Sequence, residues 1–278
     1  MKNLAGGTAV ITGAASGIGR GLANKAADEK MNLCIADMNS ESLKEVEAEL
    51  RAKGAEVFAC KLNVSDTEAM KEFAQQCYAR FGSVDLLFNN AGILRMGSSW
   101  DLSIDQWREV FEVNIIGVIN GISAFVPRMI EQGTPAHVVN TGSVGSLVAA
   151  PGMAQYTTSK MAVKGITECL AQDLIMAELP ISVSLLCPGM VSSNISEPWI
   201  RESLGDDASP ELIAEMKAAV DETYPNCITP EECANRVFDA VKRGKFWIFT
   251  HPFSKYLRNM CDAVIEERNP EYAVVEFD

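Results

Sequence analysis

The feature that most constrains the fold is an alternation of short apolar runs with longer amphipathic segments. The apolar runs are rich in β-branched residues, as buried strands are. Seven of them recur along the chain, at 8–12, 31–36, 55–60, 84–88, 136–140, 181–186 and 245–249. Apolar strands that alternate with helices form parallel sheets covered on both faces. The sequence therefore predicts an α/β protein with a doubly wound parallel sheet of seven strands.

Helix-start signals lie between these runs. Patterns that fit a capping box begin at Ser65, Ser103 and Thr229, and the last has Pro230 at the first helical position. No repeat, low-complexity linker or break in composition divides the chain. We therefore expect a single domain over residues 1–278.

Two regions depart from the alternation. Residues 190–228 contain several prolines and glycines and only one convincing helix, which begins near Ser209-Pro210. We interpret this region as a substrate-binding loop and lid. Residues 251–278 form a C-terminal extension in which a short helix is predicted over 254–268, with packing or subunit contact as its expected role.

The charge balance excludes several classes of partner. The chain has 24 basic and 37 acidic residues, and its net charge of −13 argues against a surface for nucleic acid or anionic lipid. Its 8 cysteines include no CxxC pair, and with 2 histidines they give no metal-ligand spacing. There is no signal peptide and no apolar run of about 18 residues. We expect a cytoplasmic protein without a metal or a membrane segment.

A glycine-rich stretch follows the first strand. Gly13, Ser16, Gly17, Ile18 and Gly19 lie in TGAASGIG, directly before a predicted helix. Glycines allow a sharp turn and close approach of a ligand, and the amides at the helix start can hold a pyrophosphate. The spacing is GxxxGxG rather than GxGxxG, so a plain strand-to-helix turn is the alternative.

Asp37 ends the second predicted strand, 18 residues after Gly19. A carboxylate there is placed to bind the ribose hydroxyls of a dinucleotide, and it would repel a 2′-phosphate. Met38 and Ser16 offer that phosphate no positive charge, although Arg20 is nearby. The sequence therefore favours NAD over NADP, while a turn residue before a helix cap at Asn39 or Ser40 is the alternative for Asp37.

Further motifs in order along residues 4–250 make the chain resemble the short-chain dehydrogenase/reductase family. The matching segments are TGAASGIG (12–19), NNAG (89–92), VNIIG with Asn114, NTGS with Ser143, YTTSK (156–160) and PGMVSS (188–193). The resemblance implies a Rossmann-like fold and an NAD-dependent oxidoreductase. It also implies assembly into a homodimer or homotetramer.

The resemblance also implies roles for residues at the cofactor. It places Asn90, Ala91 and Gly92 under the adenosine side, and it places Pro188, Gly189 and Val191 beside the nicotinamide. Ser193 stands where many relatives have a threonine that bonds the carboxamide. Asn63 and Val64 stand where relatives have Asp-Val beside the adenine, and Asn63 keeps both an acceptor and donors.

Tyr156 and Lys160 lie one turn apart on a predicted helix over 154–178. A free tyrosine, with a pKa near 10, is ionised only about one part in a thousand at pH 7. Lowering that pKa to about 7 requires roughly 4 kcal/mol, which an ammonium about 4 Å away could supply at an effective dielectric near 20. We predict that Tyr156 is the general acid–base, that Lys160 together with the positive nicotinamide ring of the bound cofactor lowers its pKa, and that Lys160 contacts the nicotinamide ribose.

By the same resemblance, Ser143 holds the substrate oxygen and Asn114 anchors a water in a proton relay. Each of these residues has a structural alternative as a helix or turn residue. The predicted substrate wall is apolar and rich in methionine, which suits a bulky hydrophobic secondary alcohol or ketone. With Ser143 and Tyr156, the residues predicted to contact substrate are Leu94, Met96, Leu147, Met153, Met190, Ile195 and Trp199.

Three alternatives to this substrate and this function stay open. The apolar side chains could pack the lid against the core instead of binding substrate. The protein could be a non-catalytic dinucleotide-binding regulator of the same fold. It could also be an NADP-dependent reductase of small polar carbonyl compounds.

Overall fold

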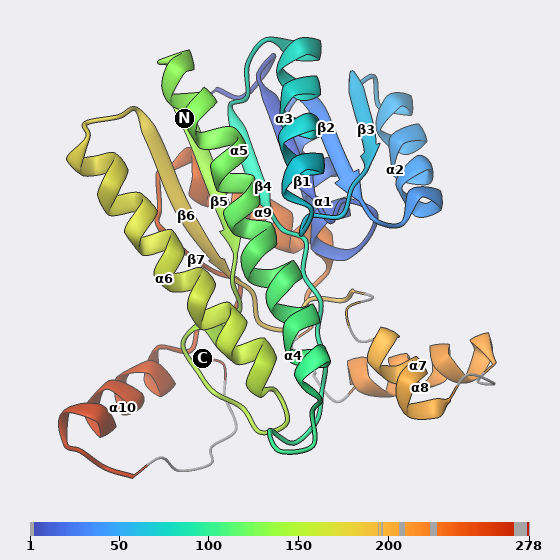
Figure 1. Cartoon of the computed structure of the whole chain (residues 1–278), viewed down its shortest axis with the longest axis vertical. Coiled ribbons are helices and arrows are strands. Elements are labelled where there is room, and N and C mark those ends of the chain that lie inside the picture. Colours follow the sequence, from blue (N-terminus) through green and yellow to red (C-terminus); the bar gives the residue numbers. More distant parts are fainter. Residues whose placement is uncertain are drawn as a thin grey trace.

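The seven apolar runs form seven strands that pair in one parallel sheet (Figure 1). This computed structural model describes residues 3–193, 195, 197–205, 209–222, 227–269 and 277. The strands are β1 (Thr8–Thr12), β2 (Asn32–Asp37), β3 (Val57–Lys61), β4 (Leu86–Asn89), β5 (Ala136–Thr141), β6 (Ile181–Cys187) and β7 (Trp247–Phe249). Their order, β3-β2-β1-β4-β5-β6-β7, confirms the predicted Rossmann-like sheet.

Helices cover both faces of this sheet (Figure 1). One face carries α1 (Gly17–Asp28), α2 (Ser40–Ala52) and α9 (Pro230–Lys242), and the other carries α3 (Thr67–Phe81), α5 (Gly117–Gln132) and α6 (Ala154–Met176). On β1, Ile11 packs in the core with Phe238 of α9, whereas its neighbour Val10 packs with Phe73 of α3 and Phe125 of α5. Successive strand residues therefore serve opposite cores, as a doubly wound sheet requires.

A long helical run precedes β5. It consists of α4 (Ile104–Phe111), a π-helical turn over Glu112–Ile116, and α5. In the described part of the chain, this is the one helix long and apolar enough to cross a membrane, and 44% of its most apolar window is buried inside the protein. Phe125 and Met129 of α5 belong to the core on the face of the sheet that carries α3, α5 and α6. Packing against the sheet thus accounts for much of its apolar surface.

Two of the three predicted capping boxes are confirmed. They begin α4 at Ser103 and α9 at Thr229. The box predicted at Ser65 is wrong, because Asp66 caps α3 by accepting from the amides of Glu68 and Ala69. The Ser65 hydroxyl instead donates to Asn63 Oδ1 at 2.9 Å.

The segment after β6 contains two helices rather than the single one predicted. The prediction of a helix from Ser209-Pro210 is confirmed by α8 (Pro210–Glu222), but α7 (Glu197–Leu204) was not foreseen. The two helices contact each other and lie beside the main body (Figure 1). At the base of the excursion Ser192 N donates to Ile228 O at 3.0 Å, which fixes the two ends of the segment together.

The tail after β7 forms α10 (Ser254–Ile265), which confirms the predicted helix. This helix also lies away from the sheet (Figure 1). No residue of α10 is buried, and Val264 is 74% exposed.

Candidate active site

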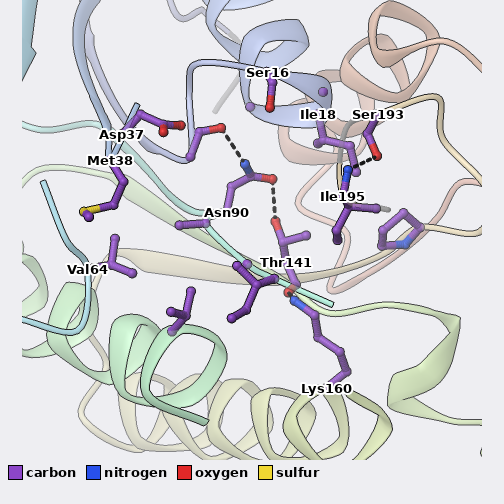
Figure 2. Close-up of a pocket in the computed structure, with 18 of the residues that line it drawn as sticks. Ser16, Ile18, Asp37, Met38, Val64, Asn90, Thr141, Lys160, Ser193 and Ile195 are labelled. Atoms are coloured by element: carbon purple, nitrogen blue, oxygen red, sulfur yellow. Dashed lines mark hydrogen bonds between the residues drawn. The ribbon is translucent and has the colours of Figure 1, made fainter. Parts of the chain in front are cut away.

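A cavity of about 390 Å³ lies where the carboxyl ends of β1 to β6 meet, and we call it the main cavity. In doubly wound sheets, ligands bind at this end, where the strand order reverses. Figure 2 shows Asp37 and Met38 on one side of the cavity and Lys160 on another. Its lining residues are Gly13, Ser16, Gly17, Ile18, Gly19, Asp37, Met38, Leu62, Asn63, Val64, Asn90, Ala91, Gly92, Ile93, Val113, Thr141, Gly142, Tyr156, Lys160, Pro188, Ser193 and Ile195.

The glycine loop forms a cradle that only glycine fits. Gly13 has φ of +65°, and a Cβ there would lie 2.8 Å from Ala91 Cα. A Cβ on Gly19 would fall on the carbonyl oxygen of Gly13. Ser16 precedes α1 without a side-chain cap bond. The amides at the start of α1 therefore face the cavity without competition from a capping side chain, which suits a pyrophosphate.

Asp37 is held at the edge of the main cavity by backbone amides. Its Oδ2 accepts from Ala15 N at 3.0 Å and its Oδ1 accepts from Asn39 N at 2.9 Å. Asn39 caps α2, so the Asp37 carboxylate links the end of β2 to the start of α2. The carboxylate is fixed in place and brings a negative charge to this side of the cavity.

The Arg20 guanidinium pairs with Glu49 and not with the Asp37 carboxylate. It donates from Nε and Nη2 to Glu49 Oε2, at 3.1 and 2.8 Å. Arg20 was the one nearby positive charge that could have favoured NADP over NAD. In the structure its guanidinium is paired with the Glu49 carboxylate.

Asn90 joins the glycine loop to β5. Its Nδ2 donates to Thr12 O at 3.1 Å. Thr141 Oγ1 donates to its Oδ1 at 3.2 Å, as Figure 2 shows. The Thr12 hydroxyl accepts from the amides of Asn90 and Ala91 at 3.0 and 3.1 Å. Three strand ends are thus held together by hydrogen bonds of their side chains. Thr12 and Thr141 were absent from the sequence prediction, although a polar residue ending an apolar strand was a usable signal.

Asn114 is buried in the π-helical turn and holds the loop after β4. Its Oδ1 accepts from Ile93 N at 2.8 Å, and its Nδ2 donates to Ile93 O and to Ser159 Oγ, both at 3.0 Å. Ser159 Oγ in turn donates to Tyr156 O at 2.7 Å. The side chain of Asn114 therefore positions the loop and the catalytic helix, and the predicted water relay stays a prediction.

Tyr156 and Lys160 project from α6 into the main cavity, as predicted. Both are buried, at 9% and 3% exposed. The Lys160 ammonium lies 5.6 Å from the Tyr156 ring centroid and donates to Thr141 O at 2.8 Å. Burial lowers the pKa of Lys160 to about 8. It therefore carries a proton that can be exchanged near neutral pH.

Burial raises the pKa of Tyr156, and a hydrogen bond with Ser143 acts in the opposite direction. Desolvation of the phenolate is the larger of these two effects. The predicted lowering of this pKa by Lys160 together with the nicotinamide ring stays a prediction. Positive charge beside the phenol would be needed to bring the pKa down.

Ser143 lies at the end of β5 within reach of Tyr156, as predicted. Its Oγ accepts from Gly145 N at 3.0 Å and also bonds the phenol. Ser146 Oγ donates to Lys160 O at 2.8 Å, so the Ser143 turn is attached to α6 at a second point. This arrangement brings a hydroxyl, a phenol and an ammonium to one wall.

The predicted residues after β6 lie beside the cavity. Pro188 and Ser193 line it, whereas Gly189 and Val191 lie next to them in the chain. A Cβ on Gly17 would approach Ser193 Cβ to 2.8 Å, so this segment crosses the glycine loop. Ser193 Oγ accepts from Ile195 N at 3.5 Å (Figure 2).

Asn63 and Val64 line the cavity, and their place beside the adenine stays a prediction. The Asn63 carbonyl oxygen is already used, because it accepts from Ser65 N and Ser65 Oγ. A contact with a base would therefore come from the amide nitrogen of Asn63.

The predicted substrate residues gather near the cavity mouth, but most do not line it. Ile195 does, and Leu94, Leu147, Met153 and Met190 are half-buried nearby in the chain. Gly97 N donates to Gly152 O at 2.9 Å, which brings the loops of Met96 and Met153 together. The side chain of Trp199, in α7, lies outside the described residues. The sequence analysis did not predict four other lining residues, Leu62, Ile93, Val113 and Gly142. Leu62 and Gly142 directly follow β3 and β5, Ile93 lies in the loop after β4, and Val113 lies in the π-helical turn.

Comparison with known proteins decides the family. The family model described as short chain dehydrogenase matches residues 7–203. The chain is a short-chain dehydrogenase/reductase. A structure of a short-chain dehydrogenase/reductase from Burkholderia phymatum in complex with NAD is 36% identical, covers 99% of both chains and superposes with a TM-score of 0.89.

Two curated members of the short-chain dehydrogenase/reductase family are also similar over most of their length. The CLA biosynthesis dehydrogenase/reductase of Lactiplantibacillus plantarum is 30% identical, with 99% of each chain covered. The 1-deoxy-11-beta-hydroxypentalenate dehydrogenase of Streptomyces avermitilis is 34% identical, with 88% of this chain and 84% of that protein covered. The main cavity is therefore the site of an oxidoreductase.

Proposed function

We propose that this protein is an NAD-dependent oxidoreductase that interconverts a bulky hydrophobic secondary alcohol and its ketone, with Tyr156 as general acid–base. The observation that carries the proposal is the placement of Tyr156 and Lys160. Both are buried on the wall of a cavity whose other side carries a glycine cradle and a fixed carboxylate. A phenol, a hydroxyl and an ammonium converge there, which general acid–base chemistry requires.

The residues of the cradle fit a dinucleotide. Gly13, Gly17 and Gly19 leave room for the pyrophosphate at the start of α1, and Asp37 would accept from the ribose hydroxyls. Its charge would oppose a 2′-phosphate, and Arg20 is occupied by Glu49. The NAD bound to the similar Burkholderia phymatum structure supports the same choice. Bound NAD would supply the hydride acceptor and a positive nicotinamide ring.

The remaining chemistry belongs to the side chains of this chain. Tyr156 would take the hydroxyl proton of the alcohol, while Ser143 holds the alcohol oxygen. Because burial raises the pKa of Tyr156, the phenolate needs positive charge nearby. Lys160 carries such a charge below a pKa of about 8, and its bond to Thr141 O keeps it in place.

The substrate class is inferred from the cavity mouth and from the relatives. Ile93 and Ile195 line the cavity, and Leu94, Leu147 and Met153 are half-buried residues of the loops and helix start that supply Ile93, Gly142 and Tyr156 to its wall. Apolar and methionine side chains suit a large hydrophobic ligand. The name of the Streptomyces avermitilis relative specifies a hydroxylated compound as its substrate.

The test is a spectrophotometric screen for NADH formation across secondary alcohols of graded size, with NADP in parallel. We expect NADH formation that increases with apolar bulk and little NADPH. Faster reaction with NADP would contradict the role of Asp37. Activity confined to small polar alcohols would contradict the substrate class.

A further inference from the structure

The turn at Pro188-Gly189 is held from two sides. Val144 N, next to Ser143, donates to Pro188 O at 2.9 Å. On the other side, Gly189 N donates to Thr250 Oγ1, also at 2.9 Å. The second bond comes from the chain that follows β7, which lies outside the motifs of the family. The turn is therefore fixed by the C-terminal part of the chain as well as by the catalytic loop.

The residues that hold this side form a small buried cluster. Thr250 is fully buried, and its hydroxyl is hydrogen-bonded with His251 Nδ1 at 2.8 Å. The His251 ring packs on Phe277, with 4.8 Å between ring centroids. We call Thr250, His251 and Phe277 the Thr250 cluster. It brings a residue near the end of the chain against the turn at Gly189.

The contact between the turn and this cluster is close. A Cβ on Gly189 would lie 2.6 Å from His251 Nδ1 and 3.0 Å from Phe277 Cζ. Atoms this near leave the turn no room to shift toward the cluster. A change of side-chain volume in the cluster would therefore be transmitted to Gly189.

The cluster also borders the base of the excursion that contains α7 and α8. Its three residues line a second cavity of about 360 Å³ together with Ile228. Ile228 N donates to Met190 O at 3.1 Å, directly after the turn. The Thr250 cluster therefore lies where the turn, the excursion and the C-terminal extension meet.

We propose that Thr250, His251 and Phe277 are positioning residues that set the Pro188-Gly189 turn and thereby the affinity for the nicotinamide end of NAD. This inference rests on the proposed function and on the place beside the nicotinamide that the family resemblance implies for the turn. The C-terminal extension would then help to position the Pro188-Gly189 turn of the same chain, in addition to packing against the body. Among the described residues, the main cavity and the cavity beside the cluster share no lining residue.

The test compares binding of NAD and of ADP-ribose, which lacks the nicotinamide, by calorimetry. Thr250→Val removes the acceptor of Gly189 N and leaves that buried amide unsatisfied, so we expect about a tenfold loss of NAD affinity. Phe277→Ala opens space beside the turn, and we expect a loss of about fivefold. In both variants the affinity for ADP-ribose should stay within about twofold, because its contacts lie elsewhere.

Matched variants separate positioning from general damage. Thr250→Ser keeps the hydroxyl and Val264→Ala changes an exposed residue of α10, so both should bind NAD as the unmodified protein does. Phe277→Leu keeps part of the apolar contact, so its loss of NAD affinity should be smaller than that of Phe277→Ala. An equal loss of affinity for NAD and for ADP-ribose would overturn the positioning role. The same holds when that loss comes with misfolding, which circular dichroism would detect. Unchanged NAD affinity in both Thr250→Val and Phe277→Ala would also overturn it. Failure of the unmodified protein to bind NAD or ADP-ribose would instead overturn the proposed function.

Discussion

The two halves of the site are built in different ways. The proposed cofactor half consists of strand ends that are cross-linked by buried and half-buried polar side chains, such as the bonds of Asn90 to Thr12 and Thr141. The proposed substrate half consists of loops and the excursion over 190–228, whose two ends are held to each other by the pairing of Val191 with Ile228. Buried bonds between regular elements hold groups more precisely than loops do. The chemistry is therefore fixed by the scaffold, while the substrate half is free to vary.

Replacing Lys160 with Met should give the largest effect in the cofactor half. Turnover should fall by at least about 10²-fold, because the charge beside Tyr156 is lost. At pH 7 the free energy of unfolding should rise by on the order of 2 kcal/mol, because the buried ammonium, whose pKa is lowered to about 8, is removed. Denaturant unfolding monitored by circular dichroism measures this gain.

The pH dependence gives a control for that prediction. Folding lowers the Lys160 pKa from 10.5 to about 8, so the cost of the ammonium is complete below pH 8 and disappears as the pH rises toward 10.5. The stability difference between the Lys160→Met variant and the unmodified protein should shrink over that range. A difference that stays constant from pH 7 to pH 10 would show that burial of charge is not its cause.

Replacing Asp37 with Asn should weaken the preference for NAD. The amide keeps one oxygen, which can accept from only one of the two backbone amides that Asp37 binds, and it removes the charge that opposes a 2′-phosphate. We expect the ratio of kcat/KM for NAD to that for NADP to fall by about tenfold. Steady-state kinetics with both cofactors measure this ratio, and an unchanged ratio would remove Asp37 from cofactor selection.

Replacing Ile195 with Ala tests the substrate half. Ile195 lines the cavity but is 37% exposed, so we expect only part of its apolar surface to contact a bound ligand. We expect KM for the best alcohol to rise by about threefold to tenfold, with NADH affinity unchanged. An equal loss of NADH affinity would show that the two halves are not separable.

Replacing Arg20 with Ala should have the smallest effect. The Arg20–Glu49 pair is largely exposed, and such pairs contribute less than about 1 kcal/mol. Thermal unfolding and the NAD to NADP ratio should both stay close to those of the unmodified protein. A marked loss of NADP use would instead show that Arg20 binds the 2′-phosphate of NADP.

The same contrast explains what could be predicted from the sequence. The five inner strands are largely buried on both faces, so their apolar runs are distinct, and β1 falls on the predicted residues Thr8–Thr12. The excursion has no such pattern, and α7 was missed because its short sequence contains Pro198 and follows several turn residues.

The site shows the same limit. Residues in motifs were found in advance, including Asp37 and Tyr156. Leu62 and Thr141 were not, because they reach the cavity only through the spatial order of the strands. The rise that burial causes in the pKa of Tyr156 also escaped prediction, since spacing along a helix does not reveal how deeply a phenol is buried.

Tyr156→Phe provides the most direct test of the central claim that Tyr156 moves the proton in a site that binds NAD independently of it. NADH formation from the best alcohol is compared with NADH binding in the same variant. The account predicts a loss of turnover of at least about 10²-fold with NADH affinity within about twofold of the unmodified protein. Near-normal turnover in Tyr156→Phe would contradict it.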